Sequence, residues 1–197
     1  IRLACNTYNV DLIGGDTSSS LTGLIISITA IGVAVPGTVV YRDGARPNDL
    51  VCVSGDLGAS YMGLILLQRE KKLYEEDKTF QPKLDGYQHI IEKQLKPEAR
   101  FDILNSLRKI GIKPNSMIDI SDGLSSDLLH ICHSSKVGCR IYADKIPIHD
   151  QTEKLADLIN IGSLVAALNG GEDYELLFTV PVTDYDKIKE ETQINII

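Results

Sequence analysis

Three stretches of the sequence place carboxylates beside glycine or serine at points where the chain turns. They read GGDTSSS over residues 14–20, MIDISDGLSSDL over 117–128 and GGEDYELLF over 170–178. Each adjoins a short apolar run that is typical of a strand. Ligand crevices of α/β proteins form at the ends of strands. We therefore expect their acids to lie in a functional site: Asp16, Asp119, Asp122, Glu172 and Asp173.

Carboxylates that converge at such a site need cations. At about 5 Å and an effective dielectric constant near 20, each pair of carboxylates repels by roughly 3 kcal/mol. Magnesium prefers oxygen ligands and commonly bridges carboxylates to nucleotide phosphates. Charge neutralisation and positioning are most of what phosphoryl transfer requires. No Cys–His or Ser–His pairing indicates a nucleophile with its base. The residues thus predict magnesium-dependent phosphate chemistry, with ATP as a candidate donor.

A structural interpretation competes at the central motif. Residues 117–120 are predicted to form a strand, and a helical pattern begins at Leu124. Ser121 or Asp122 could therefore cap that helix, and Asp127 would be favoured by the helix dipole. Capping does not explain Asp119, because a carboxylate within a buried strand is costly unless it is paired.

Two glycine loops leave similar alternatives open. Residues 14–20 could bring the backbone close to a ligand, or could form only a polar turn. Residues 54–60, SGDLGAS, join a predicted strand to a predicted helix, which is the arrangement that holds an anion on backbone amides. No Gly-Lys-Ser/Thr follows, so the loop is not a Walker motif, and a plain connection is the alternative.

The elements that must position these loops alternate between strands and helices, which indicates an α/β (α+β) fold. Apolar runs predict strands at 10–13, 24–35, 39–41, 50–53, 117–120, 139–143, 176–178 and 194–197. Helical spacing predicts helices at 1–8, 61–72, 98–110, from 124 to near Gly138, and at 151–159, 163–168 and 184–191. Residues 75–86 are predicted to be a loop. Composition shifts near residues 46–49, where we place a domain boundary.

The composition limits the class of protein. The 197 residues carry a net charge of −7, with 43% hydrophobic and 24% charged residues, which is ordinary for a soluble α/β protein. The acidic balance argues against a nucleic-acid surface, and no apolar run is long enough to predict a membrane span. The first residue is Ile1 and the last residues read as a strand just begun, so we expect a segment of a longer protein.

The four cysteines occur singly, at positions 5, 52, 132 and 139. Reduced thiols in the cytoplasm are the expected state. His130, Cys132, His133 and Cys139 are close enough in sequence to suggest zinc. Around a helix, however, the first three point in different directions, which disfavours a metal site there.

Taken together, the motifs resemble those of the thiamine-monophosphate kinases, which belong to the superfamily of aminoimidazole ribonucleotide synthetase and selenophosphate synthetase. The matching stretches are LIGGDT (12–17), RDGARPND (42–49), VSGDLGAS (53–60), MIDISDGLSSDL (117–128) and GGEDYELLFTV (170–180). The last two favour the thiamine enzyme over its relatives. The resemblance implies transfer of the ATP γ-phosphate to thiamine monophosphate, giving thiamine diphosphate directly.

The resemblance also implies roles for individual residues. Asp16, Asp119 and Asp122 would be magnesium ligands, and Glu172 would face the thiamine substrate. The residues implied to contact ATP are Gly15, Asp16, Arg42 and Ser121. No side chain is assigned a catalytic role beyond positioning metal and phosphate.

The implied architecture has two domains. Residues 1–46 would end an N-terminal ATP-binding domain that forms a homodimer, and 47–197 would be most of a C-terminal domain with a mixed sheet and helices. Further metal-binding acids and an ATP-contacting tyrosine of the family would precede Ile1, and a substrate-stacking aromatic residue would follow Ile197. The alternatives are another ATP-using member of the superfamily and a non-catalytic dimerising remnant.

Overall fold

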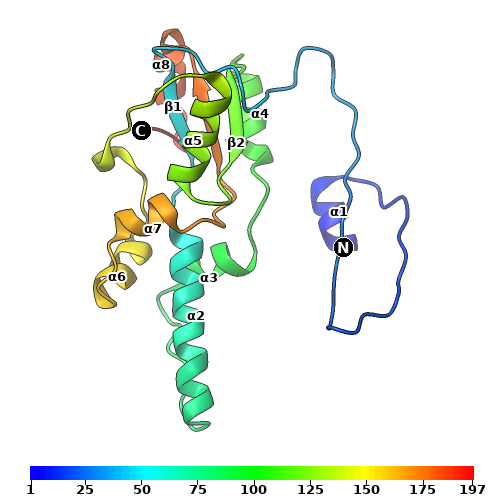
Figure 1. Ribbon diagram of the computed structural model, residues 1–197, viewed down its shortest axis with the longest axis vertical. Coiled ribbons are helices and arrows are strands. Elements are labelled where there is room, and N and C mark those ends of the chain that lie inside the picture. The colour runs from blue at the N-terminus through cyan, green and yellow to red at the C-terminus, as the bar shows by residue number, and fades with distance from the viewer. The chain divides into compact units, whose positions relative to one another are not determined.

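Figure 1 shows the computed structural model, which describes all residues from Ile1 to Ile197. The chain divides into two compact units, Ile1–Ala34 and Val35–Ile197. The strands and all helices but one belong to the second unit. None of the helices has both the length and the apolar content needed to cross a bilayer.

The first unit contains one helix, α1 (Arg2–Tyr8), which ends at Asn9 in the left-handed conformation with φ 51°. This agrees with the helix predicted at the start of the chain. The strands predicted at 10–13 and 24–35 are not formed, and apolar side chains such as Ile31 and Val33 are exposed. A strand needs a neighbour for its backbone N–H and C=O groups, and no segment of residues 1–197 pairs with this one.

The second unit is built on a four-stranded sheet in the order β2-β3-β1-β4. Its strands are β1 (Leu50–Ser54), β2 (Ser116–Asp119), β3 (Leu176–Val180) and β4 (Ile194–Ile196). The predicted α/β fold is confirmed. The sheet was expected to be mixed, but all three strand pairings are antiparallel. Apolar runs reveal where buried strands lie but not their direction, which depends on the connections.

Strand register divides the core into two layers. Val53 lies opposite Leu177, and both face a cluster that includes Leu124, Leu128 and Ile131 of α5 (Leu124–Ser135). The next pair along the strands, Cys52 and Phe178, faces the opposite cluster. That cluster also contains residues of α4 (Phe101–Lys109) and of α8 (Tyr185–Lys189). Alternation along each strand thus covers both faces of the sheet with helices.

A helical layer extends beyond the sheet (Figure 1). It consists of α2 (Ala59–Glu76), α3 (Gln88–Leu95), α6 (Asp150–Leu158) and α7 (Ser163–Asn169). Gly63 lets α2 and α3 meet, since a Cβ at this position would lie 2.0 Å from the backbone oxygen of Ile90. Helix α3 was not predicted, because it lies in a short, largely polar stretch after the predicted loop.

Two short 3-10 turns, Ala143–Lys145 and Val182–Asp184, complete the set of elements. Residues 139–143 were predicted to be a strand but form none, and residues 39–41 are likewise outside the sheet. The backbone oxygen of Tyr41 nevertheless accepts a hydrogen bond from Met117 N–H at 2.9 Å. The strand predicted at 39–41 is therefore not formed, although this bond joins its last residue to β2.

Antiparallel pairing brings the loops of interest to one edge of the sheet. Strands β1 and β2 end at this edge, where Val53 pairs with Leu177 and Asp119 pairs with Leu176 at the start of β3. The loop after β2 and the loop before β3 are therefore neighbours, although about fifty residues separate them. The predicted acidic motifs at 117–128 and 170–178 occupy these two loops.

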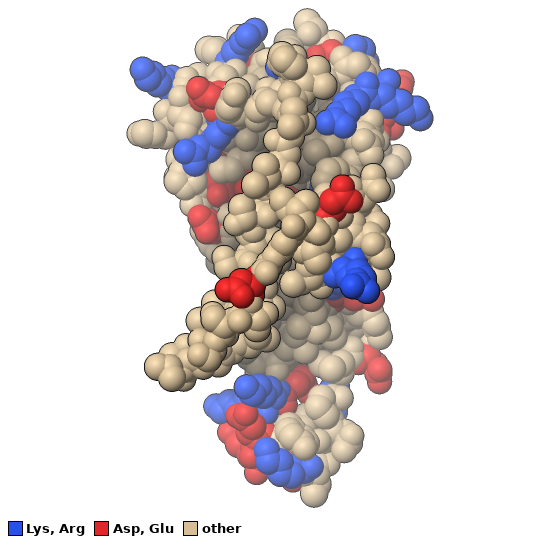
Figure 2. Space-filling model, turned by 90° about the vertical axis from the view of Figure 1, so that its right-hand side faces the viewer, with Lys and Arg blue, Asp and Glu red and all other residues tan.

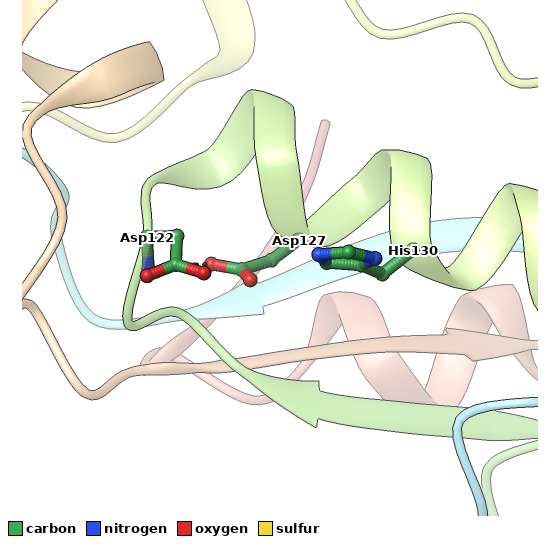
Figure 3. Close-up of side chains that lie close together, drawn as sticks. All are labelled: Asp122, Asp127 and His130. Carbon is green, nitrogen blue, oxygen red and sulfur yellow. Dashed lines mark hydrogen bonds between the residues drawn. The ribbon is translucent and has the colours of Figure 1, made fainter.

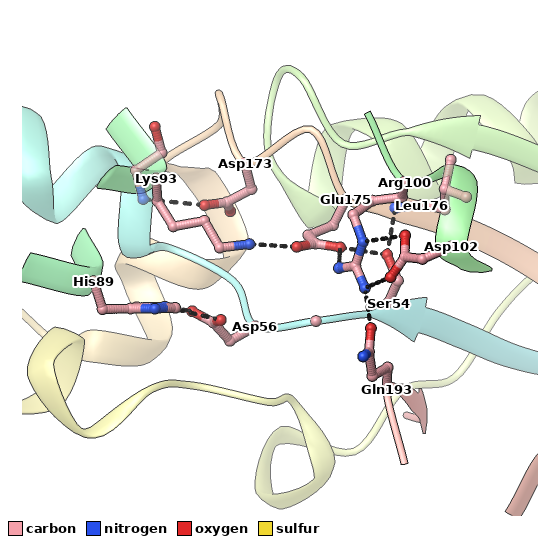
Figure 4. Close-up of polar contacts among 12 residues, drawn as sticks. Ser54, Asp56, His89, Lys93, Arg100, Asp102, Asp173, Glu175, Leu176 and Gln193 are labelled. Atoms are coloured by element: carbon pink, nitrogen blue, oxygen red, sulfur yellow. Dashed lines mark hydrogen bonds and ion pairs between the residues drawn. The ribbon is translucent and has the colours of Figure 1, made fainter. Parts of the chain in front are cut away.

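A buried charge network anchors the same edge (Figure 4). The Glu175 side chain is 1% exposed and forms ion pairs with Lys93 of α3 and with Arg100, the residue before α4. Its carboxylate also accepts a hydrogen bond from the Ser54 hydroxyl at the end of β1. Arg100 in turn contacts Asp102 at 2.9 Å. Glu175 therefore connects β1, β3, α3 and α4.

We expect Glu175→Gln to lower the free energy of unfolding by about 3 kcal/mol, because Lys93 and Arg100 would lose the anion that compensates their partly buried charges. Denaturant unfolding of the variant measures this loss. The matched control is Glu98→Gln, which removes an exposed ion pair with Lys96 and should cost less than about 1 kcal/mol. Equal stabilities of the two variants would contradict a structural role for Glu175.

Candidate functional site

The loop after β2 carries three of the predicted site residues. Asp119 is the last residue of β2, and Ser121 and Asp122 lie in the turn that leads to α5. Both carboxylates are exposed and neither forms an ion pair with any residue of the chain. Asp119 was expected to lie within a buried strand. It lies instead at the exposed end, where its charge costs little.

The loop before β3 is joined to this turn by backbone hydrogen bonds. Glu172 N–H donates to Ser121 O at 2.8 Å, and Tyr174 N–H donates to Ile120 O at 2.9 Å. Ile120 N–H donates in return to the backbone oxygen of Glu175 at 2.8 Å. These bonds fix Glu172 beside Asp122, as the sequence motifs predicted for residues of one site.

Glycines permit this close approach of the two loops. Gly171 has φ 68°, and a Cβ there would lie 2.6 Å from the backbone oxygen of Ser121. Gly123 has φ 109°, and its Cβ would lie 2.9 Å from the backbone oxygen of Leu168. Any other residue at these two positions would be strained in conformation and would collide with backbone.

Glu172 and Tyr174 also have positive φ angles, of 60° and 51°. This conformation is costly for residues other than glycine and is often found where a loop presents side chains to a ligand. Tyr174 donates its hydroxyl to the Glu172 carboxylate at 2.8 Å. That bond raises the pKa of Tyr174, and the nearby charges of Glu172, Asp119 and Asp122 raise it further. The tyrosine is therefore surrounded by the acids of the site.

Asp127 and His130 of α5 extend the acidic edge, and neither was predicted as a site residue (Figure 3). Ligand atoms of Asp122, Asp127 and His130 lie within 4.8 Å of one another. The spacing of three residues between Asp127 and His130 could have indicated a shared helix face. Asp122 was considered only as a cap of that helix or as a magnesium ligand. Burial raises the pKa of the Asp127 carboxyl, and the charges of Asp122 and Asp119 act in the same direction against two backbone hydrogen bonds.

The helix-cap interpretation of Ser121 and Asp122 is wrong. Helix α5 has Gly123 as its N-cap, and no side chain forms a capping bond there. Instead, the buried Asp127 carboxylate accepts the Asp122 N–H at 3.1 Å. Asp127 thus holds the turn from within the helix, and it leaves the Asp122 side chain exposed for another partner.

The turn predicted to hold an anion at 54–60 is formed. The anion that it holds is a side chain of the protein itself, the Asp173 carboxylate. The Asp173 carboxylate accepts hydrogen bonds from Gly58 N–H at 2.7 Å and Ser60 N–H at 3.2 Å, at the start of α2. Asp173 is 3% exposed, and burial raises its pKa to about 7. The start of α2 is therefore occupied by Asp173 and supports the neighbouring Glu172 structurally.

A small apolar recess opens beside Asp119. Its volume is about 250 Å³. Its lining comes from the start of α4, the end of β2 and the start of β3, and consists of Ala99, Arg100, Phe101, Leu104, Asp119, Tyr174 and Leu176. Two aromatic side chains and a carboxylate could hold a flat ligand next to the acidic edge. This recess was not predicted, because Phe101 is distant in sequence from every motif.

The remaining predicted residues lie elsewhere. Arg42 is exposed, and its turn is anchored by Gly44 N–H and Ala45 N–H, which both donate to Ser135 Oγ at 3.1 Å. Ser135 ends α5, whereas Asp122 precedes its start, so the Arg42 turn is fixed at the opposite end of this helix. Gly15 and Asp16 belong to the first unit, and their roles stay predictions.

The zinc alternative is not supported. The only cluster of metal-ligating side chains in the chain is Asp122, Asp127 and His130, so the four residues considered for zinc do not form one. His133 is exposed, and the four cysteines are free.

On the face shown in Figure 2, acidic and basic side chains are intermixed, including at the lower end formed by the tip of α2.

The structure is an α/β domain with exposed carboxylates at one edge of its sheet. Residues 46–192 match the family described as AIR synthase related protein, C-terminal domain. The chain belongs to this family.

The chain is similar to curated thiamine-monophosphate kinases. The one from Aquifex aeolicus is 36% identical over 194 residues, which is 98% of this chain and 58% of the relative. The one from Buchnera aphidicola of Schizaphis graminum is 38% identical over 98% of this chain and 55% of its own length. The chain therefore spans little more than half the length of these relatives.

Solved structures agree with this similarity. A structure described as AaThiL complexed with AMPPCP and TMP has a TM-score of 0.66 at 34% identity, covering 80% of this chain and 46% of that one. The thiamine-monophosphate kinase from Stenotrophomonas maltophilia has a TM-score of 0.68 at 29% identity, covering 82% and 50%. The hydrogenase maturation protein HypE from E. coli, at 17% identity with a TM-score of 0.58 over 83% of this chain and 47% of that one, shares the fold.

We expect Asp122→Asn to leave the unfolding free energy nearly unchanged, because the exposed carboxylate has no partner and its backbone N–H keeps the bond to Asp127. The matched control, Asp127→Asn, should destabilise by about 1–3 kcal/mol, because a buried acceptor is altered. Thermal and denaturant unfolding measure both. Magnesium-dependent stabilisation by an ATP analogue should disappear in Asp122→Asn. Its retention would remove Asp122 from the predicted metal ligands.

Stability should fall as pH rises from about 4 to above 7, because Asp173 has a folded-state pKa of about 7 and an unfolded pKa near 3.9. Over this window the folded state binds more protons than the unfolded state, so raising the pH favours unfolding. The contribution is about 2–4 kcal/mol. Urea unfolding at pH 5 and pH 8 should show this difference for the wild type. The difference should be much smaller in Asp173→Asn, where Asp127, whose pKa is also raised, still contributes. Asp85→Asn, in an exposed loop, should keep the full difference.

Proposed function

We propose that the protein containing this chain is a magnesium-dependent kinase that transfers the ATP γ-phosphate to thiamine monophosphate, giving thiamine diphosphate. The observation that carries this proposal is the convergence of Asp119, Asp122 and Glu172 on one edge of the sheet. The sequence similarity to thiamine-monophosphate kinases supports the choice of reaction. The AMPPCP and TMP of the AaThiL structure support the pair of substrates.

The donor set fits magnesium. Asp119 and Asp122 supply exposed carboxylate oxygens that no cation of the chain neutralises, and Asp127 lies behind them. Hard oxygen ligands of this kind are those that magnesium prefers. Asp119 and Asp122 would hold the metal at this edge. Bound there, magnesium would neutralise phosphate charge and align the donor phosphate. Asp16 is proposed as a magnesium ligand on the strength of its motif alone.

ATP would bind along the turn after β2. The backbone oxygen of Ser121 accepts Glu172 N–H, and the Asp122 amide donates to Asp127, so the Ser121 hydroxyl is the group available to phosphate. Gly15, Asp16 and Arg42 are proposed as further ATP contacts on the strength of their motifs. Arginine suits this role because its guanidinium matches phosphate oxygens in a bidentate arrangement.

The acceptor would lie next to Glu172. Tyr174 fixes the Glu172 carboxylate by its hydrogen bond and also lines the apolar recess beside Asp119. A cationic heteroaromatic ring would find aromatic walls and negative charge at this place, which suits the thiazolium of thiamine monophosphate. Its phosphate would then face the metal-binding carboxylates, where the transfer takes place.

We further propose the architecture implied by the motifs. Residues 1–46 would be the end of an N-terminal domain that forms a homodimer, and 47–197 would be most of the catalytic C-terminal domain. The exposed apolar run 24–35 supports this division, because such a segment requires a sheet partner. The free cysteines support a cytoplasmic location.

We expect the full natural protein to phosphorylate thiamine monophosphate, with ATP and magnesium, and not free thiamine. The reason is that the proposed metal site needs a phosphate on the acceptor to position it. Chromatography of the products formed from each acceptor measures the reaction. A control without magnesium should give no thiamine diphosphate.

Three outcomes would count against the proposal. Comparable turnover of free thiamine would contradict the acceptor. ATP-dependent turnover of aminoimidazole ribonucleotide precursors or selenide, without turnover of thiamine monophosphate, would favour another member of the superfamily. Failure of an ATP analogue and magnesium to raise the melting temperature would favour a non-catalytic protein.

A further inference from the structure

Two cysteines meet at the end of α5 that lies away from the acidic edge. Cys132 is in the last turn of α5, and Cys139 follows in the segment after the helix. Both line one cavity of about 480 Å³, together with Arg46 and Arg140. The Cys139 thiol lies close enough to the Cys132 thiol to contribute to its raised pKa. The proposed kinase activity uses neither residue.

The two thiols differ in access. The side chain of Cys132 belongs to the core beside Leu128 and Ile131, whereas Cys139 is exposed. Burial raises the pKa of Cys132 to about 11, and the neighbouring Cys139 thiol contributes to the increase. An oxidant from solution therefore reaches Cys139 first, and Cys132 is positioned to react second.

The chain between the cysteines can close a disulfide. Lys136 ends α5 in the left-handed conformation with φ 57°, and Val137 N–H returns to Cys132 O at 3.1 Å. This turn sends the chain back toward Cys132. Residues 137–142 form no helix or strand, and Gly138 has open space around it. Cys139 can thus adjust to disulfide geometry without disturbing a regular element.

We propose that Cys132 and Cys139 are a redox pair, in which oxidation by a low-molecular-weight disulfide such as glutathione disulfide forms a reversible intramolecular disulfide. In the first step the Cys139 thiolate attacks glutathione disulfide, forming a mixed disulfide and releasing one glutathione thiolate. In the second step Cys132, after losing its proton to solvent, attacks the Cys139 sulfur and releases the second glutathione. The two cysteines lose two electrons and two protons, and glutathione disulfide is reduced to two glutathione molecules.

The disulfide would restrict the segment that anchors the turn carrying Arg42. Ser135 lies between the two cysteines, and its hydroxyl oxygen accepts Gly44 N–H and Ala45 N–H. Closing the loop restricts the last turn of α5 and so stabilises the attachment of the turn that carries Arg42. Disulfides in reducing compartments are usually of this transient, redox-sensing kind.

The experiment treats the full natural protein with glutathione disulfide and maps its peptides by mass spectrometry before and after dithiothreitol. The expected result is a Cys132–Cys139 cross-link, a melting temperature several degrees higher than that of the reduced protein, and reversal of both by dithiothreitol. Cys5 and Cys52 serve as internal controls, because neither lines the cavity that Cys132 and Cys139 share.

Two variants separate the steps. Cys132→Ala should accumulate the mixed disulfide with glutathione on Cys139, at least about tenfold more than the wild type, because the adjacent thiol that removes it is gone. In Cys139→Ser, treated with glutathione disulfide and then unfolded, Cys132 should still react fully with an alkylating reagent. This readout does not depend on whether Cys132→Ala is stable. The proposal is overturned if Cys139 of the wild type keeps glutathione to the same extent as Cys132→Ala, or if Cys132 remains alkylatable in the treated wild type.

Discussion

The Glu175 carboxylate must be neutralised where four elements of the domain meet. It is buried, and only Lys93 of α3, Arg100 before α4 and the hydroxyl of Ser54 at the end of β1 compensate its charge. Gly55 leaves room for it, because a Cβ there would lie 2.3 Å from Glu175 Oε1. Glu175 is the last residue before β3, so the compensation of its charge fixes where the loop ends and β3 begins. The site geometry depends on that position.

From Glu175 the constraint passes to the acidic edge through the backbone. The backbone oxygen of Glu175 accepts the Ile120 N–H. The same pairing continues along the two loops, where Tyr174 N–H donates to Ile120 O and Glu172 N–H donates to Ser121 O. The turn that carries Asp122 is therefore placed by the loop that carries Glu172, and neither loop could move alone. A site built in this way keeps acids from two distant parts of the sequence at fixed separation without any side-chain bond between them.

The sequence motifs predicted this edge well, and their local physics explains why. Glycine, serine and aspartate at 117–128 and 170–178 predicted turns after and before strands, and both strands formed as β2 and β3. The prediction failed where the outcome depended on distant partners. The apolar run 24–35 has strand-forming residues but no strand to pair with, and the recess at Phe101 arises only when α4 packs near Tyr174. Likewise, the amides at the start of α2 looked available to a ligand until Asp173 was seen to occupy them.

The carboxylates of the domain fall into two physical groups, and the division shows which of them are available for chemistry. Asp127, Asp173 and Glu175 are buried, and each spends its oxygens on groups of the protein. Asp119 and Asp122 are exposed at the same edge and have no ion-pair partner in the chain. Adjacent anions without a counter-charge repel one another, and the fold gains nothing from keeping them together. The buried acids thus hold the loops in place so that the exposed acids converge, and a bound cation is the partner that would make their convergence favourable.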